Sequence, residues 1–202
     1  AVTEDDCNYS LSFDGNNDWV DIGLPDGMSP TGSHTFMFWI KFDDIVEPPT
    51  GPHECNSESI IGGYNDQPVS NRFFWYGIRD CESECPNGYC MTMDFDNSNA
   101  LVSESFPDNS WVHWALLYNA GTLERSIYRN GQLVAQDIIY SQYNGYMHII
   151  LGAMQWDCWG GMCDQLREFY SGNIDDFSVY NYYTTSEEVN SNMNNGLLGT
   201  EM

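Results

Sequence analysis

The alternation of apolar and polar residues is clearest in the middle of the chain. Residues 111–118 place aromatic and β-branched side chains on both faces of an extended segment, which predicts a strand in the centre of a sheet. Residues 123–129 predict a second strand, which ends at Asn130-Gly131, the pair that favours a two-residue hairpin turn. Residues 133–136 predict the returning strand. Three consecutive antiparallel strands form a meander, which must bury one face against a second sheet.

Short extended segments bounded by turn residues recur along the rest of the chain. The further predicted strands are residues 9–13, 19–22, 34–42, 59–63, 73–78, 91–95, 146–152 and 170–180. Thr185 and Glu188 have the spacing of a capping box, and they predict a short C-terminal helix over residues 186–193 that ends before Gly196. About a dozen short strands with a single helix are typical of an all-β, two-sheet antiparallel sandwich of jelly-roll type.

Length and charge narrow the organisation and the possible partners. A chain of 202 residues with 42% hydrophobic content is long enough for one sizeable core, so we expect a single domain over residues 1–202 with its core in residues 9–189. Thirty Asp and Glu against six Lys and Arg give a net charge of −24. Nucleic acids and anionic membrane surfaces are bound mainly by Lys and Arg, so neither is an expected partner. No apolar run approaches the length of a membrane span, so membrane insertion is not expected either.

The cysteines point to an oxidising compartment. The seven are Cys7, Cys55, Cys81, Cys85, Cys90, Cys158 and Cys163. None forms the C-x₂-C pair typical of zinc sites, and they fall in loop-like sequence rich in Gly, Pro, Asn and Asp, which favours disulfides. Asn8 begins a glycosylation sequon, in agreement with a secreted or extracellular chain. Because seven is odd, one cysteine is free or pairs with another chain or with a segment outside this sequence.

Four stretches together resemble a known family. They are FDG-x-x-DWV at residues 13–20, HTFMFWIK at 34–41, WVHWA to YRNG over 111–131, and G-x-IDDF-x-VY at 172–180 followed by SEEV at 186–189. In this order they resemble the laminin G-like domains of the concanavalin A-like lectin/glucanase superfamily, which includes pentraxin-like domains. The resemblance covers nearly the whole chain. Three cysteine-bearing insertions, at residues 43–58, 79–90 and 153–169, are absent from the family pattern.

The resemblance implies a bound calcium ion. In the family the first and last strands lie side by side, so that carboxylates from both can meet. Alternation over residues 172–180 puts Asp175 on the same face as Phe177 and Val179, the expected core face, where a carboxylate is costly unless a cation or hydrogen-bond donors satisfy it. The alternative is that Asp14 and Asp18 only cap the turn between two strands. The predicted Ca²⁺ ligands are Asp14, Asn17, Asp18, Asp175 and Asp176.

Aromatic residues in loops are the candidates for glycan contact. A sugar packs the C–H face of its ring on a flat aromatic side chain, while its hydroxyl groups need carboxylate and amide partners. The alternative is that the loop tryptophans shield a disulfide. The predicted carbohydrate-binding residues are Trp156, Asp157, Trp159 and Asp164, with Trp75 and Tyr76 as a smaller second set.

Catalytic motifs are missing from the sequence. The acidic Glu-x-Asp-x-Glu and Glu-x-Asp-x-x-Glu strands of glycoside hydrolases on this fold are absent, and five arginines and one lysine do not supply the basic motifs of polysaccharide lyases. We therefore expect a secreted, calcium-binding, non-catalytic module that binds extracellular or cell-surface glycans, polysaccharides or glycoproteins. The alternatives are a calcium-dependent protein–protein adhesion module of a larger extracellular protein and, third, a polysaccharide-degrading enzyme.

Overall fold

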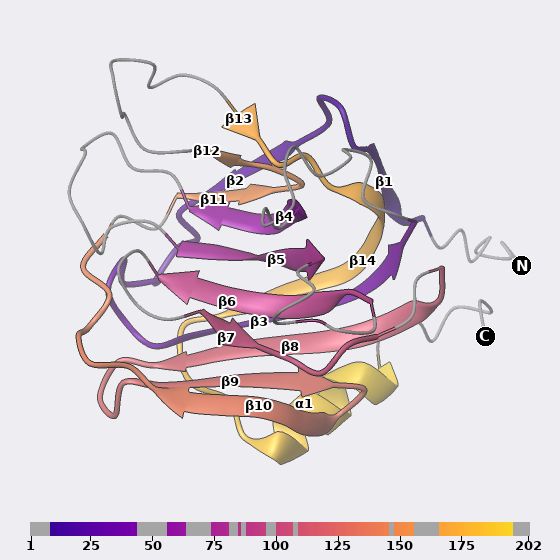
Figure 1. The fold of residues 1–202 in the computed structure, drawn as a ribbon. Coiled ribbons are helices and arrows are strands. Elements are labelled where there is room, and N and C mark those ends of the chain that lie inside the picture. The colour runs from indigo at the N-terminus through magenta and orange to yellow at the C-terminus, as the bar shows by residue number, and fades with distance from the viewer. Residues whose placement is uncertain are drawn as a thin grey trace, which may run out of the picture.

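The computed structural model describes residues 9–43, 56–63, 74–80, 85, 88–95, 100–106, 109–145, 148–155 and 166–195. They form two six-stranded antiparallel sheets, which pack face to face around one core. Figure 1 shows the two layers, with the helix against the outside of one of them. The all-β sandwich with one short helix is confirmed.

Sheet A carries the helix and contains the first and last strands of the chain. Its order is β1 (Leu11–Asp14), β14 (Ser171–Tyr180), β3 (His34–Phe42), β8 (Trp111–Asn119), β9 (Glu124–Arg129) and β10 (Gln132–Ile138). The predicted meander is confirmed as β8–β9–β10, and both turn residues, Asn130 and Gly131, have positive φ angles of 49° and 75°. These angles are the reason that the Asn-Gly pair favours this turn.

Sheet B faces the viewer in Figure 1. Its order is β2 (Val20–Gly23), β11 (Ile149–Leu151), β4 (Asn56–Gly63), β5 (Phe74–Asp80), β6 (Cys90–Phe95) and β7 (Leu101–Val102). A separate pair, β12 (Met154–Gln155) with β13 (Leu166–Arg167), forms within residues 153–169, which the sequence pattern predicted as loop.

The core between the sheets is built from aromatic rings. Along β3 the inward positions include Phe36 and Phe38, both fully buried. Arg125 of β9 is also fully buried; its Nε donates to Asp137 Oδ1 at 2.9 Å and its Nη1 donates to the Met93 carbonyl at 2.8 Å. The Asp137 carboxylate thus neutralises a guanidinium that lies inside the sandwich.

The C-terminal helix α1 (Ser186–Asn195) packs on the outer face of sheet A. The predicted capping box is confirmed: Thr185 N–H donates to Glu188 Oε2 at 2.7 Å, and Glu188 N–H donates to Thr185 Oγ1 at 3.2 Å. Val189 is buried against Met37 and neighbouring apolar residues of sheet A. Within the described residues, no helix is long and apolar enough to cross a membrane.

A bulge in β14 changes the predicted faces of its side chains. The register with β3 shifts between Asp175 and Ser178, and Asp176 has a φ angle of 48°. Ile174 and Phe177 therefore both face the core although they are three residues apart. The predicted orientation of Asp175 toward the core is wrong, because Asp175 pairs with Trp39 on the outer, helix-covered side of sheet A.

Candidate functional site

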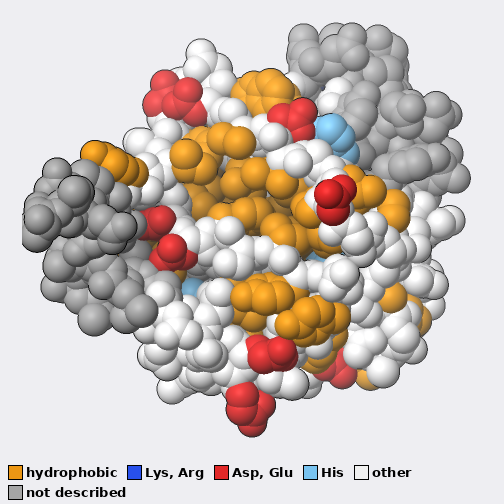
Figure 2. Space-filling view, turned by 180° about the vertical axis from the view of Figure 1, so that it is seen from behind, with side chains coloured by type: hydrophobic (Ala, Val, Ile, Leu, Met, Phe, Trp, Pro, Cys, Tyr) orange, Lys and Arg blue, Asp and Glu red, His pale blue; other side chains and the backbone are white. Residues whose placement is uncertain are grey.

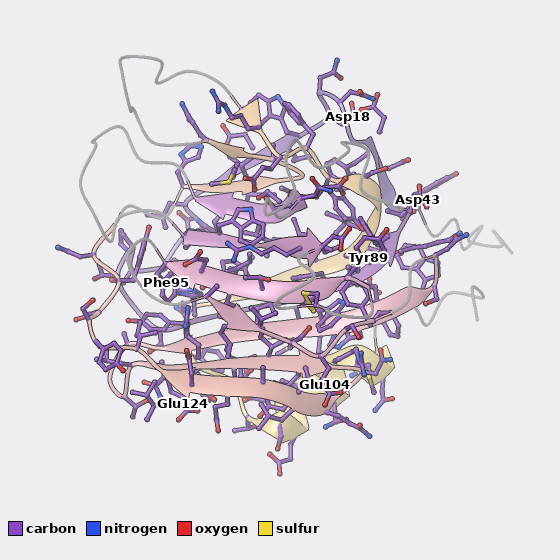
Figure 3. All side chains as sticks on the ribbon, viewed as in Figure 1. Asp18, Asp43, Tyr89, Phe95, Glu104 and Glu124 are labelled. Atoms are coloured by element: carbon purple, nitrogen blue, oxygen red, sulfur yellow. A yellow bond between two sulfur atoms is a disulfide. The ribbon has the colours of Figure 1, made fainter. Side chains whose placement is uncertain are left out.

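The predicted calcium ligands at the end of β1 form a closed turn. Asp14 Oδ1 accepts the N–H groups of Asn16 at 2.9 Å and Asn17 at 3.4 Å, and Asp18 Oδ2 accepts the Asp14 N–H at 3.1 Å. The hydrogen bond from the Asn16 N–H holds the pKa of Asp14 below its usual value. Figure 3 shows Asp18 at the margin of the sandwich, in the loop after β1. The alternative interpretation, that these residues cap the turn, describes their observed hydrogen bonds.

Asp175 and Asp176 lie away from that turn. Asp14 pairs with Ser171, so Asp175 is four strand positions farther along β14, or about 13 Å at the usual rise per residue. Asp175 Oδ1 accepts the Asp176 N–H at 2.8 Å. The Asp176 charge acts on His113 and partly offsets the fall in the His113 pKa that burial causes. These two residues therefore belong to the surface under α1.

The five predicted ligands do not fit one calcium ion. The turn and the Asp175-Asp176 pair are too far apart for a single coordination shell, whose ligands lie within about 2.6 Å of the ion. Nowhere in the described ranges do three or more His, Cys, Asp or Glu side chains come together as a metal cluster. The turn hydrogen bonds use Oδ1 of Asp14 and Oδ2 of Asp18, so the other oxygen of each carboxylate is the one that could face a cation at the turn.

A different polar cluster lies on the outer face of sheet B, and we call it the Glu168 cluster. Its members are Ser57 of β4, Trp75 and Arg79 of β5, Asp94 of β6 and Glu168 after β13. The strand register brings four of these residues together, because Ser57 pairs with Arg79 and Trp75 pairs with Asp94. Alternation along β5 turns Trp75 and Arg79 outward, while Phe74, Tyr76 and Ile78 face the core.

An ion pair on an aromatic ring forms the exposed part of the Glu168 cluster. Arg79 Nη2 lies 3.1 Å from Asp94 Oδ2, and the two side chains are 22% and 20% exposed. The Arg79 guanidinium lies over the Trp75 ring, 4.8 Å from its centroid. This stacking keeps the planar donor group in one orientation. Since Trp75 is only 3% exposed, its ring supports Arg79 and is not open to a sugar.

Glu168 completes the cluster from an unusual backbone conformation. Its φ angle is 52°, which is uncommon for a glutamate, and its carbonyl accepts the Ser59 N–H at 2.7 Å. Burial raises the pKa of its carboxyl group to about 7, although a hydrogen bond from Ser57 and the charge of Arg79 oppose the rise. Near neutral pH a larger share of this carboxyl group is therefore protonated than is usual for a glutamate.

The segment that carries Glu168 is joined to β4 by a parallel bridge between Ser59 and Phe169. β12, which pairs with β13, also packs on β4, and Gly62 permits this approach because a Cβ atom there would lie 2.4 Å from the Ala153 carbonyl oxygen. β12 and β13 pair with each other here, so the described flanks of the predicted glycan-binding loop both begin beside sheet B. The loop residues Trp156, Asp157, Trp159 and Asp164 lie outside the described residues, and their predicted role stays a prediction.

The sugar-contact prediction for Tyr76 is wrong. Tyr76 is fully buried, and its hydroxyl lies 2.7 Å from His34 Nε2 in the middle of the core. Burial lowers the pKa of that histidine to about 4, so the pair is a neutral core contact. The sequence pattern assigned Trp75 and Tyr76 to one site and did not include Arg79. Alternation along the strand nevertheless places Trp75 and Arg79 on one face and Tyr76 on the other. For Glu168 we find no local signal in the sequence.

One disulfide is present among the described residues, between Cys85 and Cys90, with a Cα–Cα distance of 5.8 Å. This confirms that cysteines of the 79–90 insertion form a disulfide. The remaining predicted positions, Cys7, Cys55, Cys81, Cys158 and Cys163 with the sequon residue Asn8, lie outside the described residues.

Solved structures similar to this chain share its fold at low sequence identity. A heptameric SAP-like pentraxin from Limulus polyphemus has 16% identity and a TM-score of 0.60, over 92% of this chain and 82% of that one. The CBM40 of the Ruminococcus gnavus IT-sialidase has 13% identity and a TM-score of 0.60, over 90% and 95%. The NanB sialidase of Streptococcus pneumoniae has 16% identity and a TM-score of 0.63 over 90% of this chain, which spans 27% of that enzyme.

Sequence comparison places the chain in a family. No curated protein sequence matches it. Residues 14–190 match the family profile Laminin_G_3, described as the concanavalin A-like lectin/glucanases superfamily. The matched range contains both six-stranded sheets apart from the first three residues of β1, and it includes every residue of the Glu168 cluster. The chain is therefore a member of the Laminin_G_3 family of the concanavalin A-like lectin/glucanases superfamily.

Proposed function

We propose that this protein is a non-catalytic, lectin-like module that acts outside the cell and binds carbohydrate on the outer face of sheet B. The observation that carries the proposal is the Glu168 cluster. On one face of the sheet it presents the oriented guanidinium of Arg79, the carboxylate of Asp94 and the carboxyl group of Glu168, whose pKa is raised to about 7. Fixed donors and acceptors of this kind form the hydrogen bonds that orient sugar hydroxyl groups.

The comparisons support the ligand class. One of the similar structures, the Ruminococcus gnavus CBM40, was solved bound to α2,3-sialyllactose. This chain differs in charge: with a net charge of −24 it repels anionic ligands at long range, and the exposed arginine of the cluster is already paired with Asp94. The proposed ligand is therefore a neutral glycan.

A glycan array tests this proposal. The wild-type domain is expected to bind neutral glycans, and Arg79→Met is expected to reduce the signal at least about tenfold by removing a charged hydrogen-bond donor. Arg129→Met on β9 is the matched control, because it removes an arginine from the other sheet. Equal loss in the two variants, or binding of wild type to sialylated glycans alone, would contradict the proposed site.

Calcium binding and extracellular location are further parts of the proposal. The ion would be held by the turn at the end of β1, with Asp14, Asn17 and Asp18 as ligands and without the Asp175-Asp176 pair. Support comes from the oxygen-rich turn and from the family resemblance. The Cys85–Cys90 disulfide supports an oxidising compartment, where such bonds persist. The absence of glycosidase motifs in the sequence supports a non-catalytic role.

A further inference from the structure

One tryptophan among the described residues has an exposed ring. Trp19, directly before β2, is 45% exposed. Trp75 and Trp114 are buried, and Trp39 and Trp111 are partly buried. Most of an indole ring is usually covered in a folded protein, because its large apolar surface is costly in water. Trp19 is therefore a candidate contact residue for a ligand.

Strand alternation turns the Trp19 ring to the outer face of sheet B. Val20, the first residue of β2, packs against the core between the sheets. Trp19 and Asp21 on either side of it therefore point the other way, and both are exposed. Their Cα atoms are about 7 Å apart at the usual rise per residue, a separation that one pyranose ring can span.

A hydrogen-bonded carboxylate lies on the same face as the ring. Asp21 Oδ1 accepts the Gly23 N–H at 2.9 Å and lies 2.7 Å from Nε2 of His148, which directly precedes β11. These two contacts fix the direction of the Asp21 side chain, and 51% of that side chain is still exposed. Both contacts use Oδ1, so Oδ2 is the oxygen that can accept a hydrogen bond from a ligand.

The surroundings of this pair are apolar and acidic. Figure 2 shows hydrophobic side chains, with carboxylates and a histidine beside them, toward the top of the face opposite to the view of Figure 1. Residues 9–40 contain four aspartates and no Lys or Arg. A ligand at this place therefore meets negative charge from β2 and the turn before it, which disfavours an anionic sugar.

We propose that Trp19 and Asp21 form a second saccharide-binding site, separate from the Glu168 cluster, for a neutral pyranose. The apolar C–H face of the sugar ring packs on the indole, and a hydroxyl group of the same sugar donates to Asp21 Oδ2. The contact with His148 keeps the carboxylate in the direction that this bond needs.

The two sites are distinct in the fold. β11 and β4 lie between β2 and β5, so the strands that carry Trp19 and Arg79 are about 14 Å apart at the usual strand spacing. The inference rests on the proposed function only for the class of ligand, because the second site shares no residue with the Glu168 cluster.

A glycan array with matched variants tests this inference. We expect a set of neutral glycans whose signal falls at least about tenfold in Trp19→Ala, because the stacking surface is removed, and persists in Arg79→Met. Trp19→Tyr should restore much of that signal, since tyrosine still offers a flat aromatic face. Asp21→Asn should lower it, because an amide oxygen is a weaker acceptor than a carboxylate.

Tyr140→Ala is the control variant. It removes an aromatic ring that is 97% exposed beyond β10, at the far end of sheet A, and should leave every signal unchanged. The indole N–H resonance of Trp19, identified by its absence in Trp19→Tyr, should shift when a glycan from that set is titrated into ¹⁵N-labelled protein. A loss of stability in Trp19→Ala would not produce this shift.

Several results would overturn the inference. Equal signals for wild type and Trp19→Ala on every neutral glycan, or an equal loss in Tyr140→Ala, would show that the ring takes no part in sugar binding. If those signals still depend on Arg79, the proposed function survives and only the second site fails. Signals that depend on Trp19 and not on Arg79 would support the second site and contradict the Glu168 cluster. Dimerisation in sedimentation that disappears in Trp19→Ala would assign the ring to a second copy of the chain.

Discussion

The raised pKa of the Glu168 carboxyl group leads to a prediction of how the stability of the protein changes with pH. The folded structure raises its pKa from 4.5 to about 7, mainly because the group is buried. A raised folded-state pKa means that folding favours the protonated form. The contribution of this group to stability is therefore complete below about pH 4.5 and is lost as the pH rises through 7. Glu168→Gln keeps the shape of the side chain and removes the ionisation.

The size of the effect follows from the shift. A rise of about 2.5 pKa units at 1.36 kcal/mol per unit corresponds to about 3 kcal/mol at most, and partial solvent access reduces it. Glu168→Gln should therefore unfold with nearly the wild-type free energy at pH 4.5 and be more stable than wild type by about 1–3 kcal/mol at pH 8.

Urea unfolding at several pH values between 4.5 and 8 measures this difference. Glu104→Gln is the control, because Glu104 is an exposed glutamate outside the cluster, labelled in Figure 3. A stability gain for Glu168→Gln that is the same at pH 4.5 and pH 8 would refute the burial argument. The burial argument would also be refuted if the stability of Glu168→Gln changed with pH in the same way as that of Glu104→Gln.

Three other perturbations have defined outcomes. Asp137→Asn leaves the buried Arg125 guanidinium without a charged partner and should cost about 3 kcal/mol in urea unfolding; a loss no larger than that of Asp26→Asn, at an exposed loop position, would contradict this. Thr185→Ala removes one half of the capping box and should cost about 1 kcal/mol, with faster amide exchange in the first turn of α1. Added Ca²⁺ should raise the free energy of unfolding relative to EDTA by up to about 4 kcal/mol for a micromolar site at millimolar Ca²⁺, and the melting temperature should rise with it. Asp14→Ala should abolish this rise and Asp175→Ala should leave it, since the structure separates the two; no rise in wild type would remove calcium from the proposal.

Most strands could be predicted because their signal is local. β3 and β8 are long enough for alternation and aromatic content to identify them, and the Asn-Gly turn and the capping box each depend on a few neighbouring residues. The strands that the pattern missed are β7, β12 and β13, with two residues each. Two residues show no periodicity, and these strands form only because another strand edge lies beside them.

The structure separates the predicted calcium ligands for a specific reason. Counting alternate residues along β14 assumes a regular strand, but the bulge at Asp176 moves Asp175 to the outer face. The register with β1 then decides that Asp14 faces Ser171 rather than Asp175. Neither the bulge nor the register has a signal in the sequence that a reading of alternation would find.

By itself the sequence determined the all-β class, the meander, the capped helix, the acidity and the family, because each depends on neighbouring residues or on composition. Only the tertiary structure decided that Glu168 meets Trp75 and Arg79, that Tyr76 lies in the core, and that Leu11 stays exposed on a core-facing position. The reason is physical: these outcomes depend on which strands become neighbours and where a sheet ends. Such contacts join residues far apart in the chain, and their free energy comes from packing rather than from local preference.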